Sequence, residues 1–197
     1  CFRNEYYETT NMVESLFCAE EILNDNVIVS YGDIIFEKNV LEQLIQSHDD
    51  ISVIIDKNWK DYWSIRSKNP LADLESLKLD SNGNITSIGQ KVKKLEEIQG
   101  QYIGLMKFSN KAVNILKDFY HECKKISKKK SNPLNANLPF EKSFMTDLLQ
   151  GLINSNYQLH SVPIHGGWLE LDTIEDFETY QKLFRNNTIK KFIKLEA

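Results

Sequence analysis

Short apolar runs alternate along this chain with longer stretches that have helical spacing. The runs have the length and composition of buried strands, and they lie at residues 27–29, 51–55, 102–108 and 158–164. Between them, apolar residues recur at intervals of three and four, which predicts helices over residues 12–23, 38–46, 109–123, 144–153 and 173–184. Strands and helices that alternate in this way predict an α/β fold with three layers, a mostly parallel sheet and one domain over residues 1–197.

Local signals refine this outline at three places. Ser81-Asn82-Gly83-Asn84 lies between two alternating segments and predicts an inserted β-hairpin. Asn11 is a good N-cap, and Glu14 three residues later resembles a capping box. Residues 168–172 alternate after a Gly-Gly bend, so that their polar and aromatic members, Trp168, Glu170 and Asp172, are expected to point to one side.

Composition excludes several classes of function. The chain has 41% hydrophobic and 26% charged residues and a net charge of −4, which is typical of a soluble globular protein and argues against a surface built to hold nucleic acid. The lysine run over residues 124–130 has no interleaved aromatics, so we interpret it as a solvated loop. We find no apolar run of transmembrane length and no signal peptide. Three scattered cysteines without CxxC spacing favour a reducing compartment, the cytoplasm.

Two acidic residues follow predicted strands. In residues 26–33, NVIVSYGD, Gly32 lets the backbone turn sharply and approach a ligand, and Asp33 projects beyond the strand end, where α/β sheets bind ligands. Asp172 ends a later strand directly before a helix. Two such carboxylates could share one Mg²⁺ and its phosphates. The alternatives are that Asp33 caps the helix over 38–46 and that Asp172 belongs to an ordinary acidic helix start.

An aromatic stretch is the candidate binding pocket for a small molecule. Trp63 and Arg66 are its best candidates, beside Trp59 and Tyr62, which could equally pack under a loop. Aromatic faces with nearby acids suit a cationic head group, whereas Arg66 suits a carboxylate, so a pocket with both would bind a zwitterion. The nearby acids are Asp56, Asp73 and Glu75. Of the four histidines, only His165 is expected near this cleft.

The chain carries an ordered set of motifs: Asn4-x-x-Tyr7-x-x-Thr10-Asn11-x-x-x-Ser15-Leu16, Tyr31-Gly32-Asp33, Gly89-x-Lys91, Gly100-x-Tyr102-x-Gly104 and Trp168-x-Glu170-x-Asp172-Thr173-x-x-Asp176. Over nearly its whole length this order resembles the sugar-phosphate and phosphocholine nucleotidyltransferase family. The resemblance is greatest to the cytidylyltransferase branch. It implies a Rossmann-like nucleotidyltransferase fold and an enzyme that joins a nucleoside triphosphate to a phosphorylated small molecule, with release of pyrophosphate.

The resemblance also implies roles for particular residues. The two metal-binding aspartates of the family fall on Asp33 and Asp172, with Mg²⁺ as the cofactor. The lysine that contacts the acceptor's phosphate falls on Lys91, with Lys93 as the alternative. Residues expected near the nucleotide are Asn11, Ser15 and Gly32, and residues expected near the acceptor include Trp168 and Glu170.

The implied substrates are CTP and an acceptor of the phosphocholine, aminophosphonate or phosphoglutamine type, used for bacterial surface polysaccharides. We expect no nucleic acid and no membrane insertion, and a homo-oligomer is compatible with the sequence. One departure is large: the family's Gly-rich phosphate loop with its basic residues is absent. We therefore expect a chain that lacks its N-terminal segment, binds nucleotide poorly and is inactive by itself.

Two other classes compete with this interpretation. A nucleotide-sugar glycosyltransferase has a related fold, but Tyr31-Gly32-Asp33-Ile34-Ile35 stands where such an enzyme would have Asp-x-Asp. A non-catalytic nucleotide-binding domain would explain the missing phosphate loop, but it would leave the retained Asp33, Lys91 and Asp172 without a reason.

Overall fold

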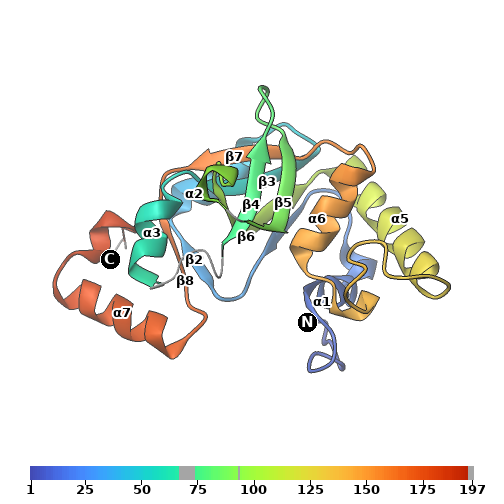
Figure 1. The fold of residues 1–197 in the computed structure, drawn as a ribbon, viewed down its shortest axis with the longest axis horizontal. Coiled ribbons are helices and arrows are strands. Elements are labelled where there is room, and N and C mark those ends of the chain that lie inside the picture. The colour runs from blue at the N-terminus through green and yellow to red at the C-terminus, as the bar shows by residue number, and fades with distance from the viewer. Residues whose placement is uncertain (67–73, 93, 195–197) are drawn as a thin grey trace.

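The computed structural model describes residues 1–66, 74–92 and 94–194. Its centre is a four-stranded sheet with the order β1-β6-β3-β7 (Figure 1). The strands span β1 Val27–Ser30, β3 Ile51–Asp56, β6 Gln101–Phe108 and β7 His160–Ile164. Strand β3 pairs with β7 in parallel, whereas β6 pairs antiparallel with both β1 and β3.

This sheet is mixed, which corrects one part of the expectation. In the described part of the chain, β1, β3 and β7 run in the same direction and β6 alone runs against them, so most hydrogen-bonded pairs are antiparallel. The reason is that the chain leaves β3 at Asp56 and returns to the same end, because Asp56 lies opposite Gln101, the first residue of β6. A connection that returns to the end it left produces an antiparallel pair. The predicted α/β class is confirmed.

Two-residue periodicity in the strands divides the core between the two faces of the sheet. On β3, Val53 and Ile55 join the hydrophobic cluster on the side of helices α1, α5 and α6, while Ile54 joins the opposite cluster beside α2 and α3. On β6, Met106 and Leu105 divide in the same way. Figure 1 shows α5 and α6 to one side of the sheet and α3 and α7 to the other. Three layers follow from this alternation.

The helices agree with the helical spacing, with changes at their ends. They span α1 Met12–Phe17, α2 Lys38–Gln46, α3 Trp59–Arg66, α5 Asn110–Ser127, α6 Met145–Asn154 and α7 Ile174–Arg185, with short 3₁₀ turns η1 Glu20–Ile22, η2 Leu95–Glu97, η3 Phe140–Lys142 and η4 Ile189–Lys191. Helix α1 is shorter than expected. Asn11 caps it by accepting from the amide of Met12, but Glu14 is drawn away to the Tyr120 hydroxyl and the Lys124 ammonium.

The lysine run is partly helical. Helix α5 continues through Lys124 and Lys125, where positive charge is favoured beside the carbonyl end of a helix. Among the described residues no helix combines the length and the apolar character that a bilayer crossing needs.

The predicted hairpin is present as β4 Glu75–Leu79 and β5 Ile85–Lys91, and it projects from the sheet in Figure 1. Its turn is closed by Asp80, whose carboxylate accepts from the amides of Asn82 and Asn84. Gly83 takes a positive φ of 83°, which glycine adopts without strain. Strand β5 is held to α6 because the Ile88 amide donates to Gln150.

A second small sheet was not predicted. Residues directly after Asp33 form β2 Ile34–Phe36, which pairs antiparallel with β8 Trp168–Glu170. Strand β2 separates Asp33 from α2, whose N-cap is Glu37. The alternative that Asp33 caps this helix is therefore wrong. The pairing instead brings two distant segments of the chain to one place.

Gly104 creates a close contact that other residues could not make. It lies at the irregularity in the β3–β6 ladder with φ 83°, and an added Cβ would stand 2.5 Å from Cγ of Tyr31. We expect Gly104→Ala to lower the free energy of unfolding by about 2–3 kcal/mol, because it combines backbone strain with a steric clash. Gly32→Ala is the matched control, since nothing lies within 4 Å of that position. Urea unfolding of the two variants measures the difference, and equal stabilities would contradict the assignment.

Candidate active site

Three carboxylates converge at the end of the β2–β8 ladder. Ile34 pairs with Glu170, and the Leu171 amide donates to the Asp33 carbonyl oxygen at 2.8 Å, which places Asp33 beside the end of β8. One carboxylate oxygen each from Asp33, Glu170 and Asp172 lies within 4.8 Å of the others. The structure thus brings together the two aspartates that the sequence singled out, and it adds Glu170. A cluster of hard oxygen donors at this spacing fits a divalent cation.

Arg66 binds the other side of this cluster. Its guanidinium donates to Glu170, to Asp172 at 2.8 Å and to both carboxylate oxygens of Asp176 at 3.0 and 3.1 Å. The same group lies over the rings of Tyr62 and Trp63, 5.5 Å from each centroid, and its side chain is only 10% exposed. Arg66 thus already binds three carboxylates of the protein itself, whereas the sequence suggested that it would bind the carboxylate of a substrate.

A pair of tyrosines fixes the backbone at the cluster. The Glu170 amide donates to the Tyr62 hydroxyl at 2.7 Å, and the Tyr180 hydroxyl donates to the Glu170 carbonyl at 2.7 Å. The two hydroxyls also share a hydrogen bond of 2.7 Å. Since Tyr62 belongs to α3 and Tyr180 to α7, both helices hold the same strand end. Burial raises the pKa of the Tyr180 hydroxyl to about 12, so it remains a donor at neutral pH.

The surrounding protein shifts the pKa values of Glu170 and Asp176 in opposite directions. Burial raises the pKa of Glu170, and the charge of Asp172 adds to that effect, while Arg66 offsets part of it. At Asp176 burial also favours the neutral form, but the Arg66 hydrogen bond and charge outweigh it and lower the pKa. A cation bound at the carboxylates would relieve the unfavourable burial of charge at Glu170.

The acidic cluster lies between two cavities. The first, which we call the acceptor cavity, has a volume of about 440 Å³, and its lining includes Trp63, Arg66, Glu75, Glu170 and Asp172. The second, which we call the nucleotide cavity, has a volume of about 470 Å³, and its lining includes Asn11, Ser15, Gly32 and Asp33. Tyr31 and Met12 line both cavities. The three residues that the resemblance placed near a nucleotide therefore share one cavity with Asp33.

Glu75 and Lys91 lie at one end of the β4–β5 hairpin. They are directly opposed in the ladder, and only Glu75 is part of the acceptor cavity lining. Glu75 is exposed on β4, yet the protein around it limits hydration of its carboxylate, and this desolvation together with the charge of Asp147 raises its pKa. Lys91 is exposed at the end of β5. The alternative lysine, Lys93, and the acidic candidate Asp73 lie outside the described residues.

Asp56 and Trp168 require a correction. Asp56 is fully buried, and its carboxylate accepts from the Gly166 amide at 2.9 Å and from Trp168 Nε1 at 3.0 Å. Trp168 is 1% exposed and packs its indole against Tyr62. Neither side chain can reach an acceptor in the acceptor cavity. They hold the turn that leads into β8, and in this way they help to position Glu170 in that strand.

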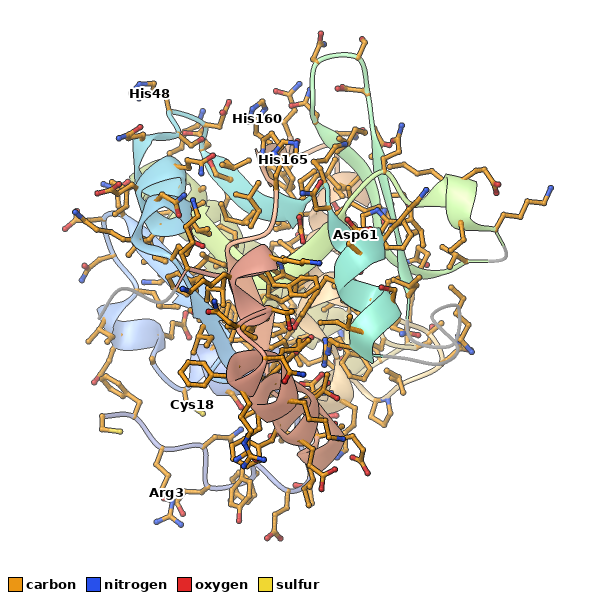
Figure 2. All side chains as sticks on the ribbon, turned by 90° about the vertical axis from the view of Figure 1, so that its left-hand side faces the viewer. Arg3, Cys18, His48, Asp61, His160 and His165 are labelled. Atoms are coloured by element: carbon orange, nitrogen blue, oxygen red, sulfur yellow. The ribbon has the colours of Figure 1, made fainter. Side chains whose placement is uncertain are left out.

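Two further aromatic residues and one histidine fall outside the acceptor cavity. Trp59 and Tyr62 are 3% exposed and belong to the hydrophobic core, which agrees with the packing alternative. His165 lines a smaller cavity of about 290 Å³ together with Asp61. Figure 2 shows both of these side chains near the start of α3. Asp176 is part of the ordered motif but was not predicted as a site residue; in the structure it binds Arg66 and forms a capping box with Thr173 at the start of α7.

Comparisons with known proteins agree with the fold and with the class of enzyme that the resemblance implied. No family model matches the chain. The chain is 36% identical over 183 residues to the CTP:phosphoglutamine cytidylyltransferase of Campylobacter jejuni subsp. jejuni serotype O:2 (strain ATCC 700819 / NCTC 11168), an alignment that covers 90% of this chain and 70% of that protein. Among solved structures, the inositol-1-phosphate CTP transferase from T. maritima is similar, with a TM-score of 0.61 and 16% identity, over 98% of this chain and 67% of that one.

A three-layer α/β fold with carboxylates gathered between two cavities is compatible with the class of nucleotidyltransferase enzymes. The solved structure supports the fold, and the 36% identity to the Campylobacter jejuni protein supports the assignment to a family. The chain belongs to the nucleotidyltransferase family, in its cytidylyltransferase branch.

Proposed function

We propose that this protein transfers CMP from CTP to a small phosphorylated acceptor that carries a positively charged amino or trimethylammonium group, and releases pyrophosphate. The observation that carries the proposal is the carboxylate cluster of Asp33, Glu170 and Asp172 between two cavities of similar size. A phosphoglutamine-type acceptor is the first candidate, because the curated relative is named for it. Phosphocholine and aminophosphonate acceptors are the alternatives. Residues 1–197 act in this proposal as one domain.

The nucleotide cavity offers space and polar edges for CTP. Gly32 leaves its neighbourhood open, so a ligand can approach the backbone there. Ser15 accepts a hydrogen bond from Asn4, and Asn11 caps α1, so these side chains shape the cavity wall and present their remaining polar atoms to the nucleotide. Asp33 belongs to the same lining, which brings the phosphate end of the nucleotide toward the acidic cluster.

The acidic cluster fits Mg²⁺. Asp33, Glu170 and Asp172 would hold the ion, and hard carboxylate oxygens are the ligands that Mg²⁺ prefers. A bound Mg²⁺ would reduce the repulsion between the two anionic substrates and stabilise charge at the α-phosphate. Asp33 and Asp172 line different cavities and would reach such an ion from each of them, while Glu170 is held in place by Arg66 and the two tyrosines.

The reaction needs no protein nucleophile. A phosphate oxygen of the acceptor attacks the α-phosphorus of CTP in line, a new P–O bond forms, and the bond to pyrophosphate breaks. Positioning and charge neutralisation supply most of the catalysis in such transfers. Lys91, at the end of β5, would hold the acceptor's phosphate as a point charge. Arg66 keeps the carboxylates in place and is a positioning residue.

Glu75 would bind the cationic group of the acceptor. Its raised pKa means that it becomes protonated at a higher pH than an ordinary glutamate, so the KM for the acceptor should increase as the pH falls through that value. We expect Glu75→Gln to raise this KM roughly 10- to 100-fold at neutral pH and to flatten its acid-side pH dependence, because a charged hydrogen bond is lost. Glu96→Gln, an exposed carboxylate on η2, is the control. An unchanged KM profile would exclude Glu75 from recognition.

Pyrophosphate release tests the function itself. The protein would be incubated with CTP, UTP, ATP or GTP and with phosphoglutamine, phosphocholine, 2-aminoethylphosphonate or inositol 1-phosphate. We expect turnover with CTP and an acceptor that has an amino or trimethylammonium group, and little with inositol phosphate. Sugar transfer from a nucleotide sugar would favour the glycosyltransferase, and nucleotide binding without turnover would favour the non-catalytic domain.

We place the reaction in the cytoplasm, consistent with the three cysteines being free thiols, and we propose that its product supplies surface polysaccharide decoration.

A further inference from the structure

Helix α7 has an apolar outer face. Ile174, Phe177 and Phe184 are 75%, 50% and 64% exposed, and their spacing places them along one stripe of the helix. Leu171, which precedes the helix, is also exposed. Figure 1 places α7 at the edge of the molecule away from the central sheet, and Figure 2, turned to that side, shows it at the front. Large apolar side chains gathered in this way mark an interaction surface.

The inner face of α7 is already occupied. Asp176 binds Arg66 of α3, Tyr180 binds Glu170, and Leu183 packs against the core cluster on this side of the sheet. The helix is therefore fixed in orientation by its contacts with α3 and β8. Because these contacts fix the inner face of α7, the apolar stripe on its opposite face is directed to the outside of the molecule.

Charges along the helix are arranged in two halves. Glu175 and Glu178 lie in the first half, and Lys182 and Arg185 lie in the second half. All four are exposed, and within the described part of the chain none of them has an ion-pair partner. At 100° per residue the four lie on one flank of the apolar stripe.

The order of charges along α7 is complementary to that of a second α7 that runs in the opposite direction. If a second α7 packs antiparallel on the first, a two-fold axis near residues 179–180 brings Glu178 next to Lys182 of the second copy and Glu175 next to Arg185 of the second copy. Both charged flanks then lie on the same side of the contact, because the axis is perpendicular to the helices. The stripes meet as well, with Ile174 against Phe184 of the other copy. In a parallel pair the two-fold axis would run along the helices, so the two charged flanks would lie on opposite sides of the contact and could not pair with each other.

We propose that the protein forms a two-fold symmetric dimer through antiparallel contact of α7 with α7 of a second copy. A symmetric contact of this kind uses one self-complementary patch on both subunits. The interface would border the active site, because the first turn of α7 carries Asp176 and follows Asp172. The proposal is independent of which acceptor the enzyme uses, since it depends only on the surface of α7.

The first test removes the apolar contact. Sedimentation velocity of the wild-type protein over a range of concentrations should show a monomer–dimer equilibrium. Phe184→Glu should weaken the dimer by roughly 100-fold or more, because it places an unpaired charge in an apolar contact twice, once from each copy. Ile45→Glu on α2 replaces a similarly exposed apolar residue elsewhere and should leave the equilibrium unchanged.

The second test uses charge and does not depend on folding differences between variants. Glu178→Lys and Lys182→Glu should each weaken the homodimer, since each places like charges together across the interface. A mixture of the two variants should form a heterodimer, because every cross-pair then has opposite charges. A wild-type protein that stays monomeric, a dimer insensitive to Phe184→Glu, or a mixture without preferential heterodimer would each overturn the proposal.

Discussion

Asp172→Asn is expected to lower kcat for pyrophosphate release about 1,000-fold, the size of effect seen when one charge-stabilising group is removed from an active site. The substitution keeps the shape of the side chain and removes its charge. Asp172 is 44% exposed, so its loss should change the melting temperature little. Asp33→Asn should behave in the same way, because the two carboxylates would share one ion.

The assay would compare the variants and the wild-type protein with CTP and the proposed acceptor. Asp61→Asn removes an exposed carboxylate from the lining of a different cavity and serves as the matched control. Isothermal titration with Mn²⁺ gives a second readout, in which Asp172→Asn should weaken binding and Asp61→Asn should not. Wild-type turnover by either cluster variant would exclude the carboxylates from the reaction.

Arg66→Met is expected to lower the free energy of unfolding by about 3–5 kcal/mol, because it leaves buried carboxylates without their counter-charge. Asp176 is 5% exposed and Glu170 is 18% exposed, so water cannot replace the guanidinium well. Arg66→Lys keeps the charge but lacks the planar group that binds three carboxylates at once. Its free energy of unfolding should therefore lie between those of the wild-type protein and Arg66→Met.

The pH dependence separates this ion-pair network from simple packing. Arg66 lowers the pKa of Asp176, so Asp176 contributes stability above the ordinary aspartate pKa of about 3.9 and loses it as the pH falls through the lowered value. In Arg66→Met that acid-side loss should shrink. Chemical unfolding from neutral to acidic pH measures it, and identical slopes for wild type and variant would show that Arg66 acts through packing alone.

Strand-end carboxylates were predictable because their chemistry is local. Asp33 and Asp172 each follow an apolar run, and the sequence was enough to expect them on one side of a sheet. Strand β2 was missed, because three residues between Asp33 and Glu37 are too few for a periodic pattern. Without that strand, the ladder that brings Glu170 next to Asp33 could not be foreseen.

Roles that depend on distant partners were harder to predict. Arg66 carries the same aromatic neighbours in sequence and in space, yet its three carboxylates lie 104 to 110 residues away. Asp56 follows an apolar run in the sequence just as Asp33 does, but it is buried and holds Trp168 and Gly166. The sequence pattern at the two strand ends is alike, and only the packing around each one distinguishes a ligand-facing acid from a structural one.

The ring of Tyr31 is a wall common to both cavities, packed on Gly104 and edge-on to Tyr102. Ligands held in the two cavities would therefore contact the same side chain. Any shift of this ring that one ligand caused would change the dissociation constant of the other, and by reciprocity the second ligand would change that of the first by the same factor.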